Sequence, residues 1–221
     1  MGTVLFLIFI IVIIILIRNG ALKTKGKIGE QRVAMELDRE LQRNSLDYKT
    51  LNDIMLQTDR GTVQIDHIVI LPWGLLVVET KNFSGWIFGD ENSKYWTQVI
   101  YNDKHRFYNP IKQNSGHIAV LKRVLGNFDN RYWELHYKSL IVFDNGCKLK
   151  KINTTTPVIY KDELKKFIAS SVNEFTTLLS RDEIEKIYQF LKNINITDEH
   201  TRRQHIKNIR KRKKNDENRL S

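Results

Sequence analysis

Asp66, Glu79 and Lys81 are the residues of this sequence whose side chains are best suited to chemistry. They lie in two strongly apolar segments, residues 63–71 and 75–81, where charged side chains are rare unless they are paired or have a task. Carboxylate oxygens suit hard cations such as Mg²⁺ or Mn²⁺, which keep several waters and bind phosphate oxygens. Such a metal activates a water and stabilises charge on a phosphodiester in the transition state. The three residues therefore indicate a divalent-metal site.

The role of Lys81 at that site has two interpretations. Its ammonium would orient or help deprotonate the water, or it would hold the developing negative charge; both roles are open because the pKa of a lysine falls on burial. The alternative is a structural Glu–Lys cluster on an ordinary hairpin, since Glu-x-Lys tripeptides are common. Glu163-Leu-Lys165 is another one in this chain, with no apolar strand around it.

A hairpin must position these three residues. Both segments are rich in β-branched residues and are separated by a Pro-Trp-Gly sequence, which predicts two strands joined by a tight turn. Side chains two apart on a strand share a face, so Glu79 and Lys81 point the same way. With a two-residue loop, Asp66 lies opposite Glu79 if Pro72-Trp73 forms the loop, or opposite Lys81 if Trp73-Gly74 does. A three-residue loop would place Asp66 on the other face.

A further carboxylate lies on a predicted helix. Residues 27–41 show helical periodicity, with an apolar stripe formed by Val33, Ala34, Leu37 and Leu41. Glu30 precedes the first three of these by three, four and seven residues, so it lies on the same stripe. The helix dipole stabilises a carboxylate in the first turn, which leaves a structural role open. The position of Glu30 on the core side points instead toward the hairpin.

Blocks of sequence in order between about residues 25 and 125 together resemble the nuclease-related domain (NERD) family. They are Gly26-Lys-Ile-Gly-Glu30, Leu51-Asn-Asp53, Gln64-Ile-Asp-His67, Val78-Glu-Thr-Lys-Asn82, Gly85-Trp-Ile-Phe-Gly89, Trp96 and Asn109-Pro-Ile-Lys-Gln-Asn114. That family is regarded as a branch of the PD-(D/E)xK nuclease-like fold. The resemblance implies an α/β, restriction-endonuclease-like mixed β-sheet core flanked by helices. It also implies a Mg²⁺- or Mn²⁺-dependent nuclease ancestry, with DNA, or else RNA, as the substrate.

The resemblance also implies catalytic roles for five residues. Asp66 matches the first acidic residue of the nuclease motif, and Glu79 and Lys81 match its (D/E)xK. Glu30 matches the acidic residue of the leading helix, and Gln113 matches a glutamine of the following helix that is grouped with the site. Asp66, Glu79 and Glu30 would then be the metal ligands.

Several other residues near these positions have both a functional and a structural interpretation. Gln113 would hydrogen-bond the attacking water or a substrate phosphate. His67 and His117 would serve as metal ligands or as a general base, but we interpret both as hydrogen-bonded structural histidines. Trp86 and Trp96 would stack on bases, but we interpret both as core or edge-packing aromatics.

The N-terminus carries a long apolar segment. Residues 4–17 are uninterrupted Val, Leu, Ile and Phe, close to the minimum of about 17 residues for a membrane span. A signal peptide, whose apolar region is about 7–15 residues long, is the alternative. No basic residue precedes the run, however, and basic residues, which stay on the cytoplasmic side, follow it. We predict a single-pass anchor over residues 1–20 in the cell membrane, with the N-terminus outside and the remaining chain cytoplasmic. The single Cys147 fits a reducing compartment.

The remaining chain predicts one α/β domain with appendages. Short strands are expected at 139–143 and 157–160, and helices at 161–168 and 181–191, the latter with Ser180 and Glu183 as a capping box. The order of elements predicts a mixed sheet whose central strands carry the site. The expected divisions are the anchor at 1–20, the nuclease-like core at 25–125, C-terminal strands and helices at 126–200, and a basic tail at 201–221.

The net charge of +11 is concentrated near the C-terminus. Residues 202–214 include no acidic residue; the basic ones are Arg202, Arg203, Lys207, Arg210, Lys211, Arg212, Lys213 and Lys214. Such a run is usually a solvated, partly disordered tail. It would bind phosphate backbones without reading sequence, or it would lie on anionic lipid, at about 1 kcal/mol per basic residue near the surface. The oligomeric state has no signal in the sequence.

Two classes of function follow from these residues. The first is a membrane-anchored, Mg²⁺-dependent nuclease that hydrolyses phosphodiester bonds in DNA. The second is a catalytically inactive nuclease-fold module that binds nucleic acid or a protein partner at the membrane. The complete set of Glu30, Asp66, Glu79 and Lys81 favours the first class, because a decayed domain need not retain it.

Overall fold

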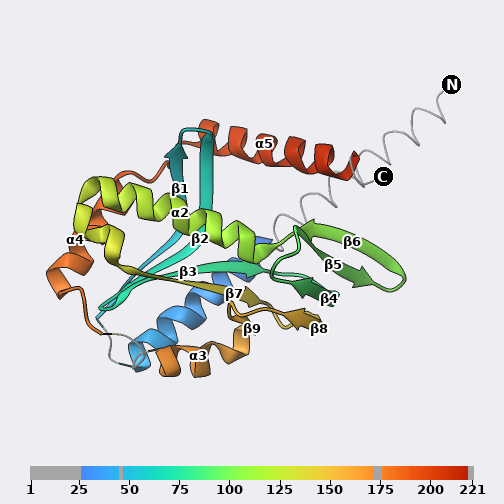
Figure 1. Cartoon of the computed structure of the whole chain (residues 1–221), viewed down its shortest axis with the longest axis horizontal. Helices are drawn as coiled ribbons and strands as arrows, with labels where there is room; N and C mark the ends of the chain where they lie inside the picture. The colour runs from blue at the N-terminus through green and yellow to red at the C-terminus, as the bar shows by residue number, and fades with distance from the viewer. Residues whose placement is uncertain (1–25, 45–46, 172–175, 219–221) are drawn as a thin grey trace.

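The computed structural model describes residues 26–44, 47–171 and 176–218 of the 221-residue chain (Figure 1). The anchor expected at 1–20, and the signal-peptide alternative to it, lie outside these residues. Within the described ranges, no helix combines the length and apolar character needed to cross a membrane.

The main sheet is mixed and has five strands. In sheet order they are β1 (Lys49–Thr58), β2 (Gly61–Leu71), β3 (Gly74–Lys81), β7 (His136–Phe143) and β9 (Val158–Tyr160). The first three form an antiparallel meander, whereas β7 runs parallel to both β3 and β9. Strand β3 is therefore central and buried on both faces, which explains its continuous apolar run.

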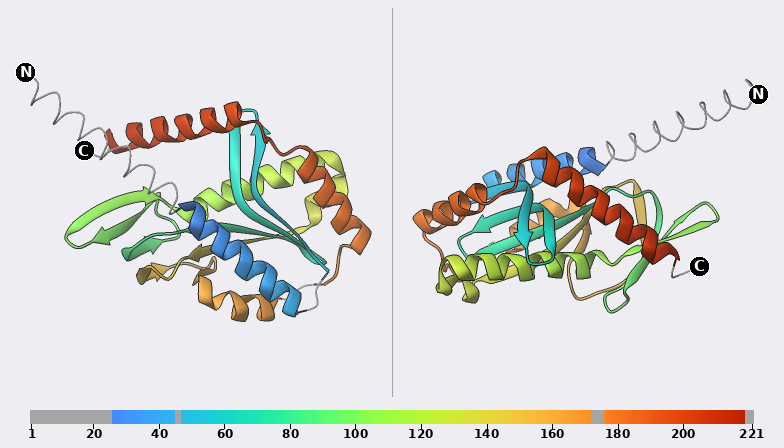
Figure 2. Two further views of the ribbon diagram at one scale, coloured as in Figure 1. Left: turned by 180° about the vertical axis from the view of Figure 1, so that it is seen from behind. Right: turned by 90° about the horizontal axis from the view of Figure 1, so that it is seen from above.

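Helices cover both faces of the main sheet, which makes the protein a mixed α/β fold. The helix at residues 26–43 and α3 (Leu164–Ser171) pack their apolar residues against one face. Helices α2 (Pro110–Phe128) and α4 (Arg181–Asn193) pack against the other. Figure 1 shows α2 in front of the strands, and the left view of Figure 2, seen from the opposite side, shows the first helix and α3 in front of them.

A second sheet of four strands extends the main one. Its order is β6 (Asp103–Tyr108), β5 (Tyr95–Ile100), β4 (Gly85–Asp90) and β8 (Cys147–Asn153). One face of this sheet packs Ile87 and Trp96 against Ile141 and Phe143 of β7. Strand β4 begins four residues after β3 ends, so the second sheet starts directly after Lys81.

The β1–β2 hairpin bends midway along its length, as Figure 1 shows. At the bend Asp53 has a positive φ of 54°, a conformation that is uncommon for residues other than glycine but more frequent for Asp and Asn. The strands pair at Asn52–His67 and at Ile54–Ile65, and the Asp53–Asp66 position between them is left unpaired. The bend therefore brings two carboxylates to one interruption of the sheet.

Several expected elements are confirmed and others differ. The strands expected at 139–143 and 157–160 correspond to β7 and β9, and helix α4 begins with the expected capping box of Ser180 and Glu183. The expectation of a partly disordered basic tail is wrong for residues 199–218, which form helix α5 (Glu199–Asn218). Short 3-10 helices, η1 (Asn130–Glu134) and η2 (Lys161–Glu163), complete the described elements.

Candidate active site

Asp66 and Glu79 lie at the point where β2 and β3 separate. Leu71 pairs with Gly74, so Pro72 and Trp73 form a two-residue loop, and the register continues to His67–Val78. One step further in that register places Asp66 opposite Glu79, as the first of the two loop alternatives predicts. There Oδ2 of Asp66 accepts a hydrogen bond of 2.8 Å from the backbone N–H of Thr80.

Lys81 connects the hairpin to helix α2. Its Nζ donates to Oε1 of Glu79 at 2.6 Å and to Oε1 of Gln113 at 3.1 Å. The Glu79 side chain is 2% exposed and that of Lys81 is 15% exposed. The Gln113 amide oxygen therefore positions the ammonium, and the expected contact of this side chain with a water or a phosphate stays a prediction.

Asn109 places Gln113 by capping helix α2. Its Oδ1 accepts from the backbone N–H of Ile111, and its Nδ2 donates to the carbonyls of Asp90, Glu91 and Ser93. The side chain is fully buried. One residue thus fixes the first turn of α2 to the turn between β4 and β5, and the first turn carries Gln113.

The second carboxylate oxygen of Glu79 has no hydrogen-bond partner among the described residues, although it is buried. His117 Nδ1, four residues after Gln113 on α2, lies 3.5 Å from it and is itself buried without a hydrogen bond in this part of the chain. Burial, and then the charge of Lys81, lower the pKa of His117 to about 4, so its imidazole is neutral. A buried carboxylate oxygen without a partner is costly, and a bound water or cation would satisfy it.

Glu30 approaches the same region from the first helix. A Cβ added to Gly29 would lie 2.7 Å from Cβ of Asn82, the residue after Lys81. Only glycine therefore permits the helix to lie this close to the end of β3. Burial, and then the charges of Asp66 and Asp53, raise the pKa of Glu30 to about 7. Glu30 thus lies near enough to the carboxylates of Asp66 and Asp53 for their charges to affect its pKa.

The electrostatics of the cluster favour an added positive charge. Burial, and then Glu79, raise the pKa of Asp66 to about 8, and burial also raises the pKa of Glu79. Burial lowers the pKa of Lys81, but Glu79 and Asp66 outweigh it, so the pKa lies above its usual value. The charges of Glu79, Asp66 and Glu30 all raise the pKa of the one ammonium, whereas the carboxyl pKa values are raised first by burial and then by mutual repulsion.

The carboxylate oxygens of the site are suitable ligands for a hard divalent cation, but they do not lie close enough together to bind one as they stand. Three carboxylates and an unpartnered oxygen on Glu79 are the ligand chemistry that Mg²⁺ and Mn²⁺ prefer. Over residues 26–44, 47–171 and 176–218, however, no group of three or more His, Cys, Asp or Glu side chains lies close enough together to hold a metal. Binding a cation would therefore require side-chain movement around Glu79 and Asp66.

Asp53 is a fourth carboxylate beside the site, and no pattern in the sequence predicts it as a site residue. It faces the unpaired position of Asp66 and raises the pKa of both Asp66 and Glu30. Its Oδ1 accepts from Gln64 and its Oδ2 from Arg202. Asp53 belongs to a block that carried the family resemblance, and its positive φ could not be seen in the sequence.

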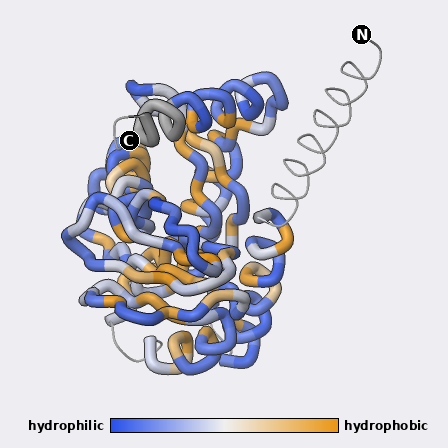
Figure 3. Tube along the Cα trace, turned by 90° about the vertical axis from the view of Figure 1, so that its right-hand side faces the viewer, coloured by the Kyte–Doolittle hydropathy of each residue, from blue (hydrophilic) through white to orange (hydrophobic). Residues whose placement is uncertain are grey.

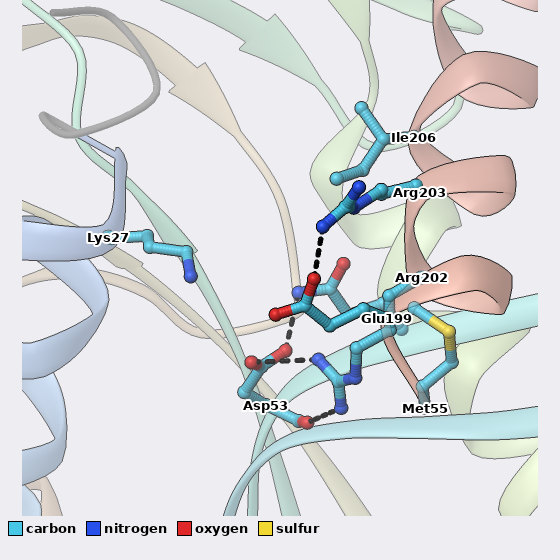
Figure 4. A pocket seen from close by; sticks show the side chains of 8 residues that line it. Lys27, Asp53, Met55, Glu199, Arg202, Arg203 and Ile206 are labelled. Atoms are coloured by element: carbon cyan, nitrogen blue, oxygen red, sulfur yellow. Dashed lines mark hydrogen bonds and ion pairs between the residues drawn. The ribbon is translucent and has the colours of Figure 1, made fainter. Parts of the chain in front are cut away.

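The basic helix α5 forms one wall of a pocket beside the bend. The pocket has a volume of about 370 Å³ and is lined by Lys27, Asp53, Met55, Gln64, Glu199, Arg202, Arg203 and Ile206. Figure 4 shows Lys27 on the first helix facing Arg203 on α5 across the strands. His205 anchors the helix by a hydrogen bond of 2.8 Å between its Nδ1 and Oγ1 of Thr62.

The members of the basic run differ in their positions. Arg202 is partly buried on Asp53, and Arg203 pairs with Glu199 on its own helix. Like Arg203, the residues Lys207, Arg210 and Lys211 are exposed. The side chains of Arg212, Lys213 and Lys214 lie outside the described part.

His67 and Trp96 have structural environments. His67 Nδ1 lies 2.8 Å from Oδ1 of Asn52 and its Nε2 lies 3.1 Å from Oγ1 of Thr80, which fits a neutral ring that donates from Nδ1. Burial lowers the pKa of His67 to about 4. Trp96 is 1% exposed, but Trp86 is 50% exposed, so a core role is wrong for Trp86.

Comparison with known proteins places the chain in a family. The profile of the nuclease-related domain family matches residues 25–144, which contain every residue of the candidate site except those on α5. A Bacillus anthracis protein described as uncharacterized is 33% identical over 215 residues, covering 94% of this chain and 96% of the relative. No solved structure matches. The chain belongs to the nuclease-related domain family.

Proposed function

We propose that this member of the nuclease-related domain family is a metal-dependent phosphodiesterase that cleaves nucleic acid, with DNA as the first candidate substrate. The observation that carries the proposal is the meeting of Asp66 and Glu79 at the parting of two strands, with Lys81 bound to Glu79. The order of these residues and the mixed sheet that bears them support a restriction-endonuclease-like core.

Asp66 and Glu79, with Glu30 beside them, would hold Mg²⁺ or Mn²⁺. The ion would supply a polarised water and compensate charge on the phosphate. The unpartnered oxygen of Glu79 supports this assignment, because a cation would satisfy it. The raised carboxyl pKa values support it as well, since a cation would stabilise carboxylates whose charged form is disfavoured first by burial and then by mutual repulsion.

Lys81 would act as a hydrogen-bond donor. Burial lowers its pKa, but the charges of Glu79 and Asp66 outweigh burial and raise the pKa above the usual value, which favours the protonated ammonium. From its position between Glu79 and Gln113 it would orient the attacking water or stabilise charge on a phosphate oxygen. Gln113 and Asn109 would act indirectly, by positioning that ammonium.

The charges around the site suit a polyanionic substrate. Lys27 and Arg203 line opposite walls of the pocket beside Asp53, and α5 carries exposed Lys207, Arg210 and Lys211 beyond it. Contacts of this kind bind phosphates without reading sequence and weaken with salt. We therefore assign α5 to the nucleic-acid backbone, with anionic lipid as the competing partner.

Lys81→Ala tests the proposal directly. Full-length protein in a mild detergent, supplied with Mg²⁺ or Mn²⁺, is expected to cleave DNA, and the variant is expected to lose cleavage while it keeps DNA affinity. Lys165→Ala is the matched control, because it removes the exposed lysine of the other Glu-x-Lys tripeptide. Equal cleavage by Lys81→Ala and the wild type would refute the assignment.

A non-catalytic module is the second candidate, and one observation favours it. Lys81 already occupies Oε1 of Glu79, and no three-ligand metal group is assembled among the residues that the structure describes. The fold would then bind nucleic acid or a protein at the membrane without cleaving. Absence of cleavage with every DNA and RNA form tested, together with retained DNA binding, would select this candidate.

The location of the domain is part of the proposal. We assign residues 1–20 to a single-pass anchor with the nuclease-like domain in the cytoplasm, because basic residues follow the apolar run and none precedes it. A reporter fused after Ser221 should be active in the cytoplasm, and the mature chain should retain its first 17 residues. A mature N-terminus near Ala21 would instead identify a signal peptide.

A further inference from the structure

The outer face of the second sheet is solvent-exposed and combines aromatic with basic side chains. Side chains alternate along each strand, and the inner face carries Ile87 and Trp96, which are buried against the main sheet. Trp86, on the other parity of β4, is 50% exposed, and Tyr108 of β6 is 44% exposed. The outer face therefore begins with aromatic rings in contact with solvent.

Cross-strand pairing places these rings on the same face of neighbouring strands. Tyr95 pairs with Tyr108, and their ring centroids are 6.3 Å apart. Trp86 pairs with Val99 on β5, four residues along the same face from Tyr95. Three rings from neighbouring strands thus share one surface that no helix of the described chain covers, as Figure 1 shows at the right-hand end of the molecule.

Basic side chains lie over these rings. Lys150 Nζ is 4.6 Å from the ring centroid of Trp86, and Lys94 Nζ is 5.1 Å from that of Tyr95. The Arg106 guanidinium lies 6.0 Å from the ring of Tyr95 as well. Other exposed basic residues of β6 and β8 are Lys104, Lys148 and Lys151. Figure 3 looks onto this end of the molecule and shows hydrophilic segments of the chain facing the viewer.

The acidic residues near this face either accept hydrogen bonds from neighbouring residues or point to the other side of the sheet. Asp90 accepts hydrogen bonds from Asn153 and Asn92, and Glu91 accepts from Thr155 and Thr156. Asp103 begins β6 and pairs with Ile100, on the opposite parity to Trp86 and Tyr108. The face as a whole is therefore positive and complements a polyanion that offers planar rings.

We propose that the outer face of the second sheet binds single-stranded nucleic acid, with bases stacked on Trp86, Tyr95 and Tyr108 and phosphates held by the surrounding lysines and arginines. A duplex hides the faces of its bases, whereas an unpaired strand offers them. A cation–π contact at an exposed site is worth about 0.5–1 kcal/mol, and base–aromatic stacking about 1–3 kcal/mol. A base therefore displaces the lysine from the ring, and the released ammonium binds a phosphate.

The outer face of the second sheet is close enough to the candidate active site for one bound strand to reach both. Trp86 follows Lys81 by five residues, so their Cα atoms are separated by at most about 18 Å. At the rise of about 3.4 Å per nucleotide of a stacked strand, this corresponds to at most about five nucleotides. Delivery of that strand to Asp66 and Glu79 rests on the proposed function, whereas binding of the strand does not.

Binding is tested with full-length protein in neutral-lipid nanodiscs and a chelator present, so that no cleavage contributes. Fluorescence anisotropy with a labelled 15-nucleotide thymidine strand should show about tenfold weaker binding for Trp86→Ala and for Tyr108→Ala. Binding to a blunt duplex of equal length should change by less than twofold. Tyr101→Ala is the matched control, because that ring is 97% exposed but lies at the β5–β6 turn; it should bind as the wild type does.

Three kinds of result would overturn the proposal. One is unchanged single-strand affinity in both Trp86→Ala and Tyr108→Ala. Another is an equal loss in Tyr101→Ala, or an equal loss of duplex binding. The third is displacement of the strand by vesicles containing phosphatidylserine, with vesicle binding lost in Trp86→Ala, which would identify the face as a lipid surface. Because the assay contains no free metal, it tests single-strand binding by the outer face of the second sheet independently of the nuclease activity.

Discussion

Arg202 on α5 forms an ion pair with Asp53 at the bend of the β1–β2 hairpin. Its Nη1 donates to Oδ2 of Asp53 at 2.9 Å, and its Nη2 donates to the backbone carbonyl of the same residue at 2.9 Å. Its Nε also donates to the carbonyl of Ile196. Hydrogen bonds from a charged guanidinium, above all the one to the Asp53 carboxylate, are stronger than bonds between neutral groups. A basic helix that could have been a free tail is thereby held beside the candidate active site.

Arg202→Ala should release α5 from the bend. We expect faster amide hydrogen exchange in α5 and an affinity for DNA that falls by more than the loss of one charge explains. Arg203→Ala is the matched control, since Arg203 pairs only with Glu199 on its own helix among the described ion pairs. It should weaken DNA binding and reduce its salt dependence by about one ion, with no change in exchange. Identical exchange profiles for the two variants would contradict the anchoring role.

Asp66→Asn should abolish divalent-cation binding. Calorimetry of full-length protein with Mn²⁺ is expected to give one site in the wild type and none in Asp66→Asn or Glu79→Gln, because each variant removes a charged ligand. Glu163→Gln changes the exposed carboxylate of the other Glu-x-Lys tripeptide and should bind as the wild type does. Equal binding in Asp66→Asn and the wild type would exclude this carboxylate as a ligand.

The pH dependence of stability should report the same cluster in the absence of metal. The pKa of Asp66 is about 8 in the folded chain and near 4 when unfolded. A raised acid binds more protons when folded, so its stabilising contribution is present below the unfolded value and is lost as pH rises through about 8. Asp66→Asn removes that charge and should therefore stabilise the metal-free protein at pH 8–9. One pKa unit corresponds to about 1.4 kcal/mol, so more than about 1 kcal/mol is expected in chemical denaturation.

Glu91→Gln serves as the control of opposite sign for that experiment. Hydrogen bonds from Thr156 and Thr155 lower the pKa of Glu91 to about 2. Its contribution is therefore present above the unfolded pKa and lost as pH falls toward 2, so the variant should be destabilised at neutral pH. If Asp66→Asn were also destabilised at pH 8–9, the charged form of Asp66 would not destabilise the fold, and its pKa would not be raised.

Gly29→Ala should displace Glu30 without unfolding the protein. The new methyl group would lie 2.7 Å from Cβ of Asn82, so the first helix must shift away from the end of β3. A displacement of about 1 Å can cost about 100-fold in rate, and we expect cleavage to fall at least tenfold. Gly26→Ala is the matched control, because its Cβ would meet nothing within 4 Å. Equal activity of the two alanine variants would show that Glu30 needs no precise position.

Local patterns predicted much of the fold because they depend on near neighbours in the chain. The β-branched runs around Pro72-Trp73 predicted the β2–β3 hairpin, and Ser180 with Glu183 predicted the start of α4. Strands β1, β6 and β8 were not predicted. Strand β6 reads Asp-Lys-His-Arg at its start, and only its pairing with β5 makes it a strand. Edge strands of this kind are stabilised by cross-strand contacts more than by their own composition.

The sequence by itself determined the chemistry of the site: its carboxylates, its lysine and the family to which their order belongs. Only the tertiary structure decided which loop residues set the register, and hence that Asp66 faces Glu79. It also decided that Asp53 joins them, that Trp86 faces solvent and that the basic run is a helix tied to the bend. The physical reason is that side-chain identity is carried by single residues, whereas proximity and burial arise from contacts between segments far apart in the chain. Asp53 and Arg202, 149 residues apart, have no local pattern that joins them.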